Sequence, residues 1–331
     1  MTSEATGTGR LGRGGGVVCL GEAIVDLVGA GPAPSVAEVG SFQPAPGGSL
    51  ANIACVAARY GAPASLVGGA GGDEWGAWLR DRIAAEGVDV SRFRLVGHSS
   101  SIAFIAHSED GEPDFHVHEA NERPPALAAG DLERALAGAP GVLVLGSDTL
   151  LGAAEREVTM DAARLAHERG WQVLADPNLR PARWSSREQM LEAAAALVAA
   201  ASVVKCNGAE AGALTGEEGE VAAEALLGLG PEVAVVTRAG RGALFARAGA
   251  ELVTVPSPEV DRVVDATGAG DSVTGVLAAA LARGAGPDAL PGALAVAMST
   301  AAGVVASRGA LAGLPGAEQA SGALERALRG S

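Results

Sequence analysis

The chain has 331 residues, enough for one large hydrophobic core, and a net charge of −15. This acidic balance argues against nucleic acids and anionic membranes as default partners, because both would repel the chain. Its three cysteines (Cys19, Cys55 and Cys206) are too few and too far apart for a disulfide framework, which favours a reducing, cytoplasmic location.

Residues 1–15 are rich in Gly, Thr and Arg and lack the apolar segment of a secretory signal, so we expect a disordered tail. Within this tail, Gly-Thr-Gly-Arg-Leu-Gly at residues 7–12 matches the dinucleotide fingerprint Gly-x-Gly-x-x-Gly. However, the match precedes the first expected strand, and no acidic residue stands at the expected place on a second strand. A nucleotide-dependent oxidoreductase is therefore disfavoured.

From residue 16 onward, apolar runs of strand length alternate with helical stretches. We expect helices over residues 48–60 and 73–86 and two more after residue 291. The expected strands are residues 17–20, 64–69, 142–145, 172–175, 202–204 and 233–236. This alternation predicts an α/β fold with a mostly parallel central sheet and helices on both faces. The longest apolar run, residues 193–204, is too short to span a bilayer.

Two segments, residues 29–45 and 93–122, lack helical patterns and carry alternating or β-branched residues instead. They predict a small antiparallel sheet, with a hairpin turn at residues 109–112, inserted into one domain that covers residues 16–331. His116 and His118 lie on one face of an expected strand there. A metal pair is conceivable, but no third ligand is near in sequence, so an ordinary strand is favoured.

Residues 263–275 predict a short strand at Val263, a turn loosened by Gly268 and Gly270, and a helix. The first amides of that helix would lack partners and carry the positive end of the helix dipole, which suits phosphate oxygens. Asp271 lies in the first turn, where the dipole should lower its pKa. The same local pattern would also arise from a tight loop without a binding function, in which the helix dipole favours an acidic residue at the helix start.

Lys205 is the only lysine of the chain, and Cys206 follows it, so the sequence contains no Gly-Lys-Ser/Thr phosphate loop. No protein-kinase signature accompanies this lysine. An enzyme that uses ATP would have to hold it with helix ends and other side chains.

Two signatures that lie more than 200 residues apart favour a functional interpretation of these patterns over a purely structural one. Asp-Ala-Thr-Gly-Ala-Gly-Asp at residues 265–271 closely resembles the carboxy-terminal signature of the ribokinase-like (PfkB) carbohydrate kinases. Gly-Gly-Ser-Leu-Ala-Asn-Ile-Ala at residues 47–54 resembles the amino-terminal signature of the same family. The resemblance implies a ribokinase-like fold with a small β-sheet lid, and transfer of the γ-phosphoryl group of ATP to a sugar hydroxyl with Mg²⁺.

The resemblance also implies roles for individual residues. Asp271 would be the catalytic base, the amides of Ala269, Gly270 and Asp271 would form the anion hole, and Gly268 would belong to the same catalytic turn. The sugar would be held by Asp26, Gly47, Gly48, Asn52 and Arg180. ATP would be bordered by Lys205, Asn207, Glu210, Thr237, Gly240 and Gly242. Asn207 and Glu210 would position Mg²⁺ through water, and Asp265 and Thr267 hold a monovalent cation, K⁺, in some relatives.

Without the resemblance, several of these residues have simpler explanations. Asp26 would be a solvated loop residue after the first strand, Asn52 would belong to a capped helix start, and Glu210 would be an ordinary acid in a first helical turn.

The acceptor is suggested by Asp-Pro-Asn-Leu-Arg-Pro at residues 176–181, which resembles the fructokinase and 2-keto-3-deoxygluconate kinase branch. Glu119 stands where that branch often carries an arginine, which favours a neutral hexose such as fructose over a keto-deoxy acid. A 2-keto-3-deoxygluconate kinase, a ribokinase and, less so, a nucleoside kinase stay open as alternatives. A non-catalytic sugar-binding regulator would keep Asp26 and Asn52 but lose the base or the anion hole. Lids of this kind often pair in homodimers.

Overall fold

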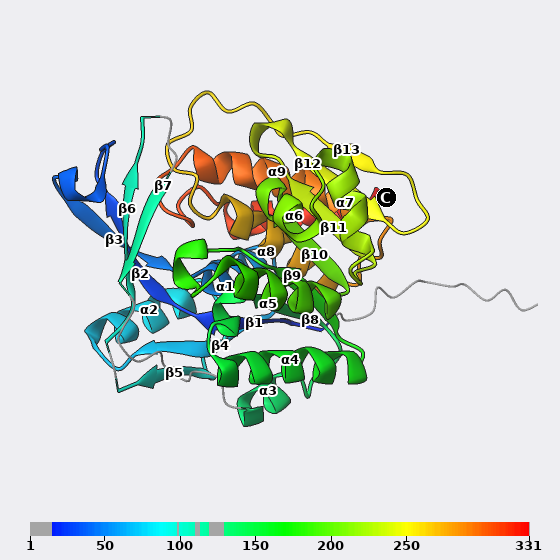
Figure 1. Cartoon of the computed structure of the whole chain (residues 1–331), viewed down its shortest axis with the longest axis horizontal. Helices are drawn as coiled ribbons and strands as arrows, with labels where there is room; N and C mark the ends of the chain where they lie inside the picture. Colours follow the sequence, from blue (N-terminus) through cyan, green and yellow to red (C-terminus); the bar gives the residue numbers. More distant parts are fainter. Residues whose placement is uncertain (1–14, 98, 110–112, 119–128, 331) are drawn as a thin grey trace, which may run out of the picture.

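The computed structural model describes residues 15–97, 99–109, 113–118 and 129–330, which form a large sheet and a separate small sheet (Figure 1). The large sheet has the order β13-β12-β11-β10-β9-β8-β1-β4-β5, and the small sheet has the order β3-β2-β6-β7. In chain order, the strands of the large sheet are β1 (Val17–Glu22), β4 (Ala64–Gly71), β5 (Phe93–Val96), β8 (Val142–Gly146), β9 (Gln172–Asp176), β10 (Val203–Asn207), β11 (Val233–Thr237), β12 (Ala243–Arg247) and β13 (Val253–Val255).

Strands β1, β4, β5 and β8 to β11 run parallel, and β12 and β13 add an antiparallel edge. A parallel sheet is usually covered by helices on both faces. Strand β8 fits this pattern, because all five of its residues are buried and both of its faces must therefore be covered. The helices are α1 (Ser49–Arg59), α2 (Glu74–Ala85), α3 (Ala129–Ala135), α4 (Ala153–Glu168), α5 (Arg187–Ala199), α6 (Gly208–Thr215), α7 (Gly219–Leu227), α8 (Ala269–Ala282), α9 (Leu290–Val305) and α10 (Ala317–Arg329).

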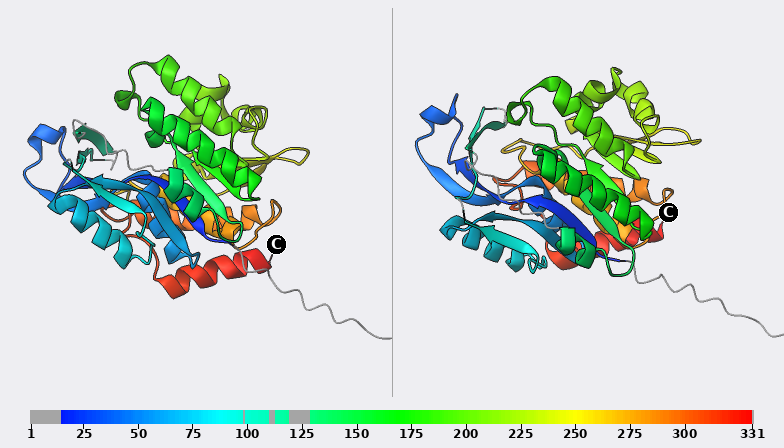
Figure 2. Two further views of the ribbon diagram at one scale, coloured as in Figure 1. Left: turned by 90° about the horizontal axis from the view of Figure 1, so that it is seen from below. Right: turned by 60° about the horizontal axis from the view of Figure 1, so that its bottom comes forward.

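The helices form two layers with the large sheet between them (Figure 2). Alternate residues of β1 show this: Val17 and Cys19 pack in the core with α1, α2, α8, α9 and α10, whereas Val18 and Leu20 pack in the core with α3 to α7. The predicted α/β fold with helices on both faces is thereby confirmed. No helix in the described part of the chain is both long and apolar enough to cross a membrane.

Helix α8 is buried along nearly its whole length from Ser272 to Ala282, and it packs against α1. At the crossing, a Cβ on Gly275 would collide with the side chain of Val56. Glycine is therefore required there, and the close approach brings the first turns of the two helices together. Both predicted signatures lie in those first turns.

The small sheet consists of β2 (Ile24–Gly29), β3 (Phe42–Gly47), β6 (Ile102–His107) and β7 (Pro113–His118), and it lies beside the amino-terminal half of the large sheet (Figure 1). Two expectations about it were wrong. Its central strands β2 and β6 run parallel, so the sheet is mixed rather than antiparallel. Residues 93–96, expected in it, form β5 of the large sheet, because Phe93 buries its ring in the main core.

Strands β6 and β7 pair antiparallel out to His107 and Pro113, as a hairpin requires. The predicted turn at residues 109–112 lies mostly outside the described residues, as do residues 119–122 and most of the predicted tail. The short strand expected at Val263 is absent from this described segment. The amides of Val264 and Asp265 instead bond the carbonyl of Val305 at the end of α9, which leaves them no neighbouring strand.

Candidate active site

A cavity of about 920 Å³ lies between the carboxyl ends of the parallel strands and the inner face of the small sheet. Ligands of open α/β sheets bind at such strand ends. Its walls include residues from both signatures and from the predicted nucleotide side: Asp26, Gly48, Asn52, Arg180, Lys205, Asn207, Glu210, Thr237, Gly240, Thr267, Gly268, Ala269, Gly270 and Asp271. Gly47, Gly242 and Asp265, which were predicted with them, lie behind the wall.

The glycine-rich turn ends at Gly268, which has a φ of 79° and is the N-cap of α8. A Cβ at Gly268 would overlap Ala310, so only glycine fits there. The amides of Gly270 and Asp271 bond no other described residue, whereas the amide of Ala269 lies 3.3 Å from the carbonyl of Ala266. Two free amides and a helix dipole therefore face the cavity, and the third amide of the predicted anion hole is partly used by the turn.

The carboxylate of Asp271 is held by the first turn of α1. Ser49 Oγ donates to its Oδ1 at 2.7 Å, and Asn52 Nδ2 donates to its Oδ2 at 2.8 Å. Burial raises the pKa of Asp271 and the charge of Asp176 adds to this, although the bonds from Asn52 and Ser49 oppose it. The expected lowering was wrong, because removal from water outweighs the dipole at the helix start. A raised pKa makes Asp271 a stronger base.

Lys205 reaches the same turn from the end of β10. A Cβ on Gly270 would lie 2.8 Å from its Nζ, and the same Nζ lies 3.1 Å from Oδ2 of Asp176. Thr274 of α8 donates to that oxygen at 2.6 Å. Burial works to lower the pKa of Lys205, but the charges of Asp176 and Glu210 outweigh it and raise the pKa. The lysine therefore stays cationic beside the free amides.

Asp26 comes from β2 of the small sheet, not from a loop that follows β1 as the sequence suggested. It is 5% exposed, and a Cβ at Gly47 would overlap its carboxyl, so this glycine makes room for it. Burial raises the pKa of Asp26 to about 8, with additions from the charges of Asp271 and Asp265 and an opposing effect of Arg180. Gly48, with a φ of 99°, turns the chain from β3 into α1.

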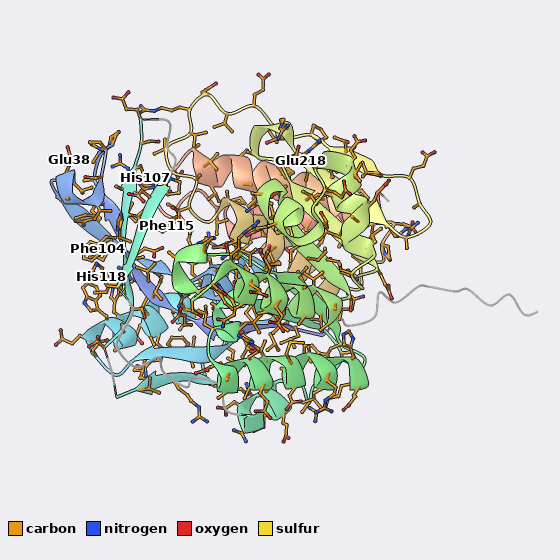
Figure 3. All side chains as sticks on the ribbon, in the orientation of Figure 1. Glu38, Phe104, His107, Phe115, His118 and Glu218 are labelled. Atoms are coloured by element: carbon orange, nitrogen blue, oxygen red, sulfur yellow. The ribbon has the colours of Figure 1, made fainter. Side chains whose placement is uncertain are left out.

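Arg180 and Phe115 face each other across the cavity, with the guanidinium 5.7 Å from the ring centroid. Phe115 of β7 lies on the inner face of the small sheet, and His118 lies on the outer face with its ring 5.4 Å from that of Phe104 (Figure 3). Within the described part of the chain, His116 bonds its neighbour Asp114 at 3.1 Å. Among the described residues, no three His, Cys, Asp or Glu side chains are grouped to hold a metal ion.

On the nucleotide side, Asn207 and Glu210 form a capping box at the start of α6, with both bonds at 2.9 Å. The second oxygen of Glu210 accepts from the amide of Leu179 at 2.8 Å. Each oxygen keeps a lone pair, so a water-mediated contact to a metal fits, whereas a direct metal cage does not. Gly242 has a φ of 83° and abuts Val255, so it shapes the turn.

Three protein groups surround the carboxylate of Asp265. Its Oδ1 accepts from the amide of Thr267 at 2.8 Å and lies 2.8 Å from Nε2 of His107, and its Oδ2 accepts from the amide of Gly309 at 2.8 Å. These bonds, with His107 first, lower the pKa of Asp265 against the effect of burial. The ring of His107 lies at Oδ1 of Asp265, so a monovalent cation could reach that oxygen only if the ring moved.

Sequence reasoning missed four polar residues around the cleft: Ser49, His107, Asp148 and Thr274. Ser49 lies inside the amino-terminal signature at residues 47–54, near the start of the expected helix. That position could have marked it as a site residue. Asp148 follows an apolar strand, the same position that drew attention to Asp176. Nothing in the local sequence could have paired His107 with Asp265, because the two come from different sheets and loops.

A turn with free amides, a carboxylate beside it and a small sheet over the cleft define a ribokinase-like phosphotransferase. Residues 15–317 match the family described as pfkB family carbohydrate kinase. The chain therefore belongs to the pfkB family of carbohydrate kinases and is a sugar phosphotransferase.

Three known proteins illustrate the relationship. Fructokinase-1 of Oryza sativa subsp. japonica is 33% identical over 273 residues, which are 80% of this chain and 83% of that protein. A fructokinase from Vibrio cholerae O395, solved with fructose, ADP and calcium ion, has a TM-score of 0.83 and 26% identity over 94% of this chain and 99% of its own. An aminoimidazole riboside kinase from Salmonella enterica, solved with aminoimidazole riboside and an ATP analogue, has a TM-score of 0.77 and 30% identity over 93% of this chain and 99% of its own.

Proposed function

We propose that the protein transfers the γ-phosphoryl group of ATP to a hydroxyl of a neutral sugar, with fructose as the first candidate. The observation that carries this proposal is the contact of Asp271 with Ser49 and Asn52 beside the free amides of Gly270 and Asp271. A base and an anion cradle thus stand at one end of a single cavity.

In this proposal the sugar lies between Asp26, Asn52 and Arg180. Asp26 accepts hydrogen bonds from sugar hydroxyls, and Asn52 shares its amide between the sugar and Asp271. Because Asp26 comes from the small sheet and Asn52 from the large domain, a bound sugar would join the two parts. The small sheet would act as a lid that excludes water and so suppresses ATP hydrolysis.

In the proposed reaction, Asp271 accepts the proton of the attacking hydroxyl as the oxygen bonds to the γ-phosphorus and the bond to the β-phosphate oxygen breaks. ADP and a sugar phosphate leave, and the proton remains on the carboxylate until solvent removes it. The free amides and the Lys205 ammonium stabilise the negative charge on the transferred group.

The nucleotide would lie along Thr237, Gly240 and Asn207, which line the same cavity. Mg²⁺ supplies charge neutralisation between the phosphates when it is bound. Glu210 is the residue that would orient its water shell, since it lines the cavity together with Asn207 and Lys205.

We also propose that residues 16–331 act as one domain and that two copies pair through the outer face of the small sheet. Phe42, Phe104 and His118 form an edge-to-face series on that face, which would supply an apolar contact. A cytoplasmic location fits the three cysteines, which are all free and buried.

The test is an assay of ADP release with fructose, ribose, 2-keto-3-deoxygluconate, adenosine and aminoimidazole riboside as acceptors. We expect fructose to give the highest kcat/KM and the anionic sugar acid to be a poor substrate. If no acceptor stimulates ADP release, the proposed function is wrong.

A further inference from the structure

Glu210 holds two segments of the chain at once, the start of α6 and the segment that follows β9. Its Oε2 accepts from the amide of Asn207 at 2.9 Å, and its Oε1 accepts from the amide of Leu179 at 2.8 Å. Asn207 belongs to the predicted nucleotide side, whereas Leu179 lies in the motif of residues 176–181 that suggested the acceptor. Glu210 is 6% exposed, so little water competes for these bonds. One buried carboxylate therefore joins the two sides of the site.

Leu179 connects Glu210 to Arg180. The carbonyl of Leu179 accepts from Nη1 of Arg180 at 3.2 Å, and its side chain packs in a small core cluster with Met190. The guanidinium of Arg180 then lies 5.7 Å from the ring centroid of Phe115, and both residues line the cavity. The backbone of Leu179 is thus fixed at its amide by Glu210 and supports Arg180 at its carbonyl.

The peptide between Asn178 and Leu179 needs such support. Asn178 has a φ of 44°, in the left-handed region that residues other than glycine adopt only at some cost. The carbonyl of this peptide accepts from Oγ of Ser147 at 3.4 Å, and its amide donates to Glu210 at 2.8 Å. The shorter bond, which ends on a carboxylate, is the stronger of the two. Glu210 is therefore the main support of the peptide that leads to Arg180.

We propose that Glu210 is a positioning residue for the acceptor: through the amide of Leu179 it fixes the backbone that carries Arg180 into the cavity. This inference rests on the proposed function, in which Arg180 contacts the sugar. It gives Glu210 a role that is independent of the nucleotide and of Mg²⁺. The affinity for the acceptor should therefore depend on Glu210 even when neither nucleotide nor metal is bound.

The experiment measures the Kd of the acceptor by calorimetry in EDTA and without nucleotide. The probe is the acceptor with the highest kcat/KM in the assay above, which we expect to be fructose. Glu210→Gln still completes a capping box with its oxygen, but its NH₂ group cannot accept from the amide of Leu179. Glu210→Asp keeps the charge but is one methylene shorter, so it cannot hold both amides. Tm is measured for every variant.

Two control variants separate this role from other effects of the substitutions. Asn207→Ser keeps a residue type that caps helices but removes the side-chain amide on the predicted nucleotide side. Glu218→Gln removes the same charge from an exposed residue at the start of α7 (Figure 3). A fifth variant combines Glu210→Gln with Arg180→Ala and is compared with Arg180→Ala alone.

Both Glu210 variants should raise the acceptor Kd by about 10-fold, because a hydrogen bond to a charged group is lost. The acceptor Kd of Asn207→Ser and of Glu218→Gln should equal that of the wild type, although Asn207→Ser should raise KM for ATP. The double variant should bind the acceptor no more weakly than Arg180→Ala, because Glu210 acts through that arginine.

A wild-type acceptor Kd in either folded Glu210 variant would overturn the inference and leave the proposed function standing. Effects of Glu210→Gln and Arg180→Ala that add in the double variant would also overturn it. The same holds for an equal rise of the acceptor Kd in Asn207→Ser, which would mean that any change at the start of α6 disturbs the acceptor. Absence of any phosphorylated acceptor with the wild type would instead overturn the proposed function itself.

Discussion

Asn52 donates a hydrogen bond to Oδ2 of Asp271 at 2.8 Å, although 219 residues separate the two in the chain. Ser49 holds the other carboxylate oxygen. The proposed base is thus oriented by helix α1, whose residues Ser49 and Asn52 also line the cavity. This arrangement depends on the tight crossing of α1 and α8 at Gly275.

Gly268→Ala should inactivate the enzyme, and a matched control is available. Gly268 and Gly284 both have a positive φ (79° and 82°), but only a Cβ on Gly268 meets another part of the chain, Ala310. Gly284→Ala should cost about 1 kcal/mol in unfolding free energy and keep its activity. Gly268→Ala should cost more and lower kcat by displacing the free amides. Equal kinetics in the two variants would contradict this account.

Lys205→Met should lower kcat and also destabilise the fold, because it leaves Asp176 buried beside a neutral side chain. Loss of one partner of a buried ion pair costs about 3–5 kcal/mol. Adding Asp176→Asn should restore much of the stability measured by urea unfolding. The double variant should still have a low kcat, since the cation beside the free amides is gone. Recovery of kcat together with stability would show that Lys205 acts only in packing.

Asp26→Asn should stabilise the unliganded protein while weakening sugar binding. The folded pKa of about 8 lies above the ordinary value of 3.8, so ionisation opposes folding. Below pH 3.8 the carboxyl is protonated in both the folded and the unfolded protein, so it does not affect the free energy of unfolding. That free energy falls as the pH rises from 3.8 to about 8 and is constant above about 8. The Tm gain of Asp26→Asn should therefore increase from pH 5 to pH 8. A gain that is the same at both pH values would contradict the assigned pKa.

The contact of His107 with Asp265 predicts how the enzyme responds to potassium. Because the imidazole covers Oδ1 of Asp265, wild-type turnover should be the same in KCl and in choline chloride at equal ionic strength. His107→Ala uncovers Oδ1 near the buried hydroxyl of Thr267, which has no hydrogen-bond partner in the described part of the chain, and should make turnover depend on potassium. A wild-type enzyme that is inactive without potassium would refute this explanation.

The large sheet could be predicted because its strands are buried on both faces and read as continuous apolar runs between helices. The four residues of β5 could not, because an edge strand so short carries no pattern that assigns it to one sheet or the other. The segment at Val263 looks like a strand in sequence, but its amides are taken by a helix end. Strand pairing is a tertiary property that local patterns do not contain.

The candidate active site could likewise be predicted only in part. The residues that the structure brings together around Asp271 could be predicted from the two signatures, because a family motif contains residue types that lie in one cleft. The pKa of Asp271 was predicted in the wrong direction, since a dipole can be inferred from sequence but burial cannot.

The most direct test of the account is the turnover of Asp271→Asn with its preferred sugar, measured together with sugar binding by calorimetry. Asparagine keeps the shape, its oxygen can still accept from Asn52 and its NH₂ group can donate to the Ser49 hydroxyl, but it cannot accept the proton. We predict that kcat falls by about 100-fold or more while the sugar Kd stays close to that of the wild type. A kcat near the wild-type value would contradict the assignment of Asp271 as the base.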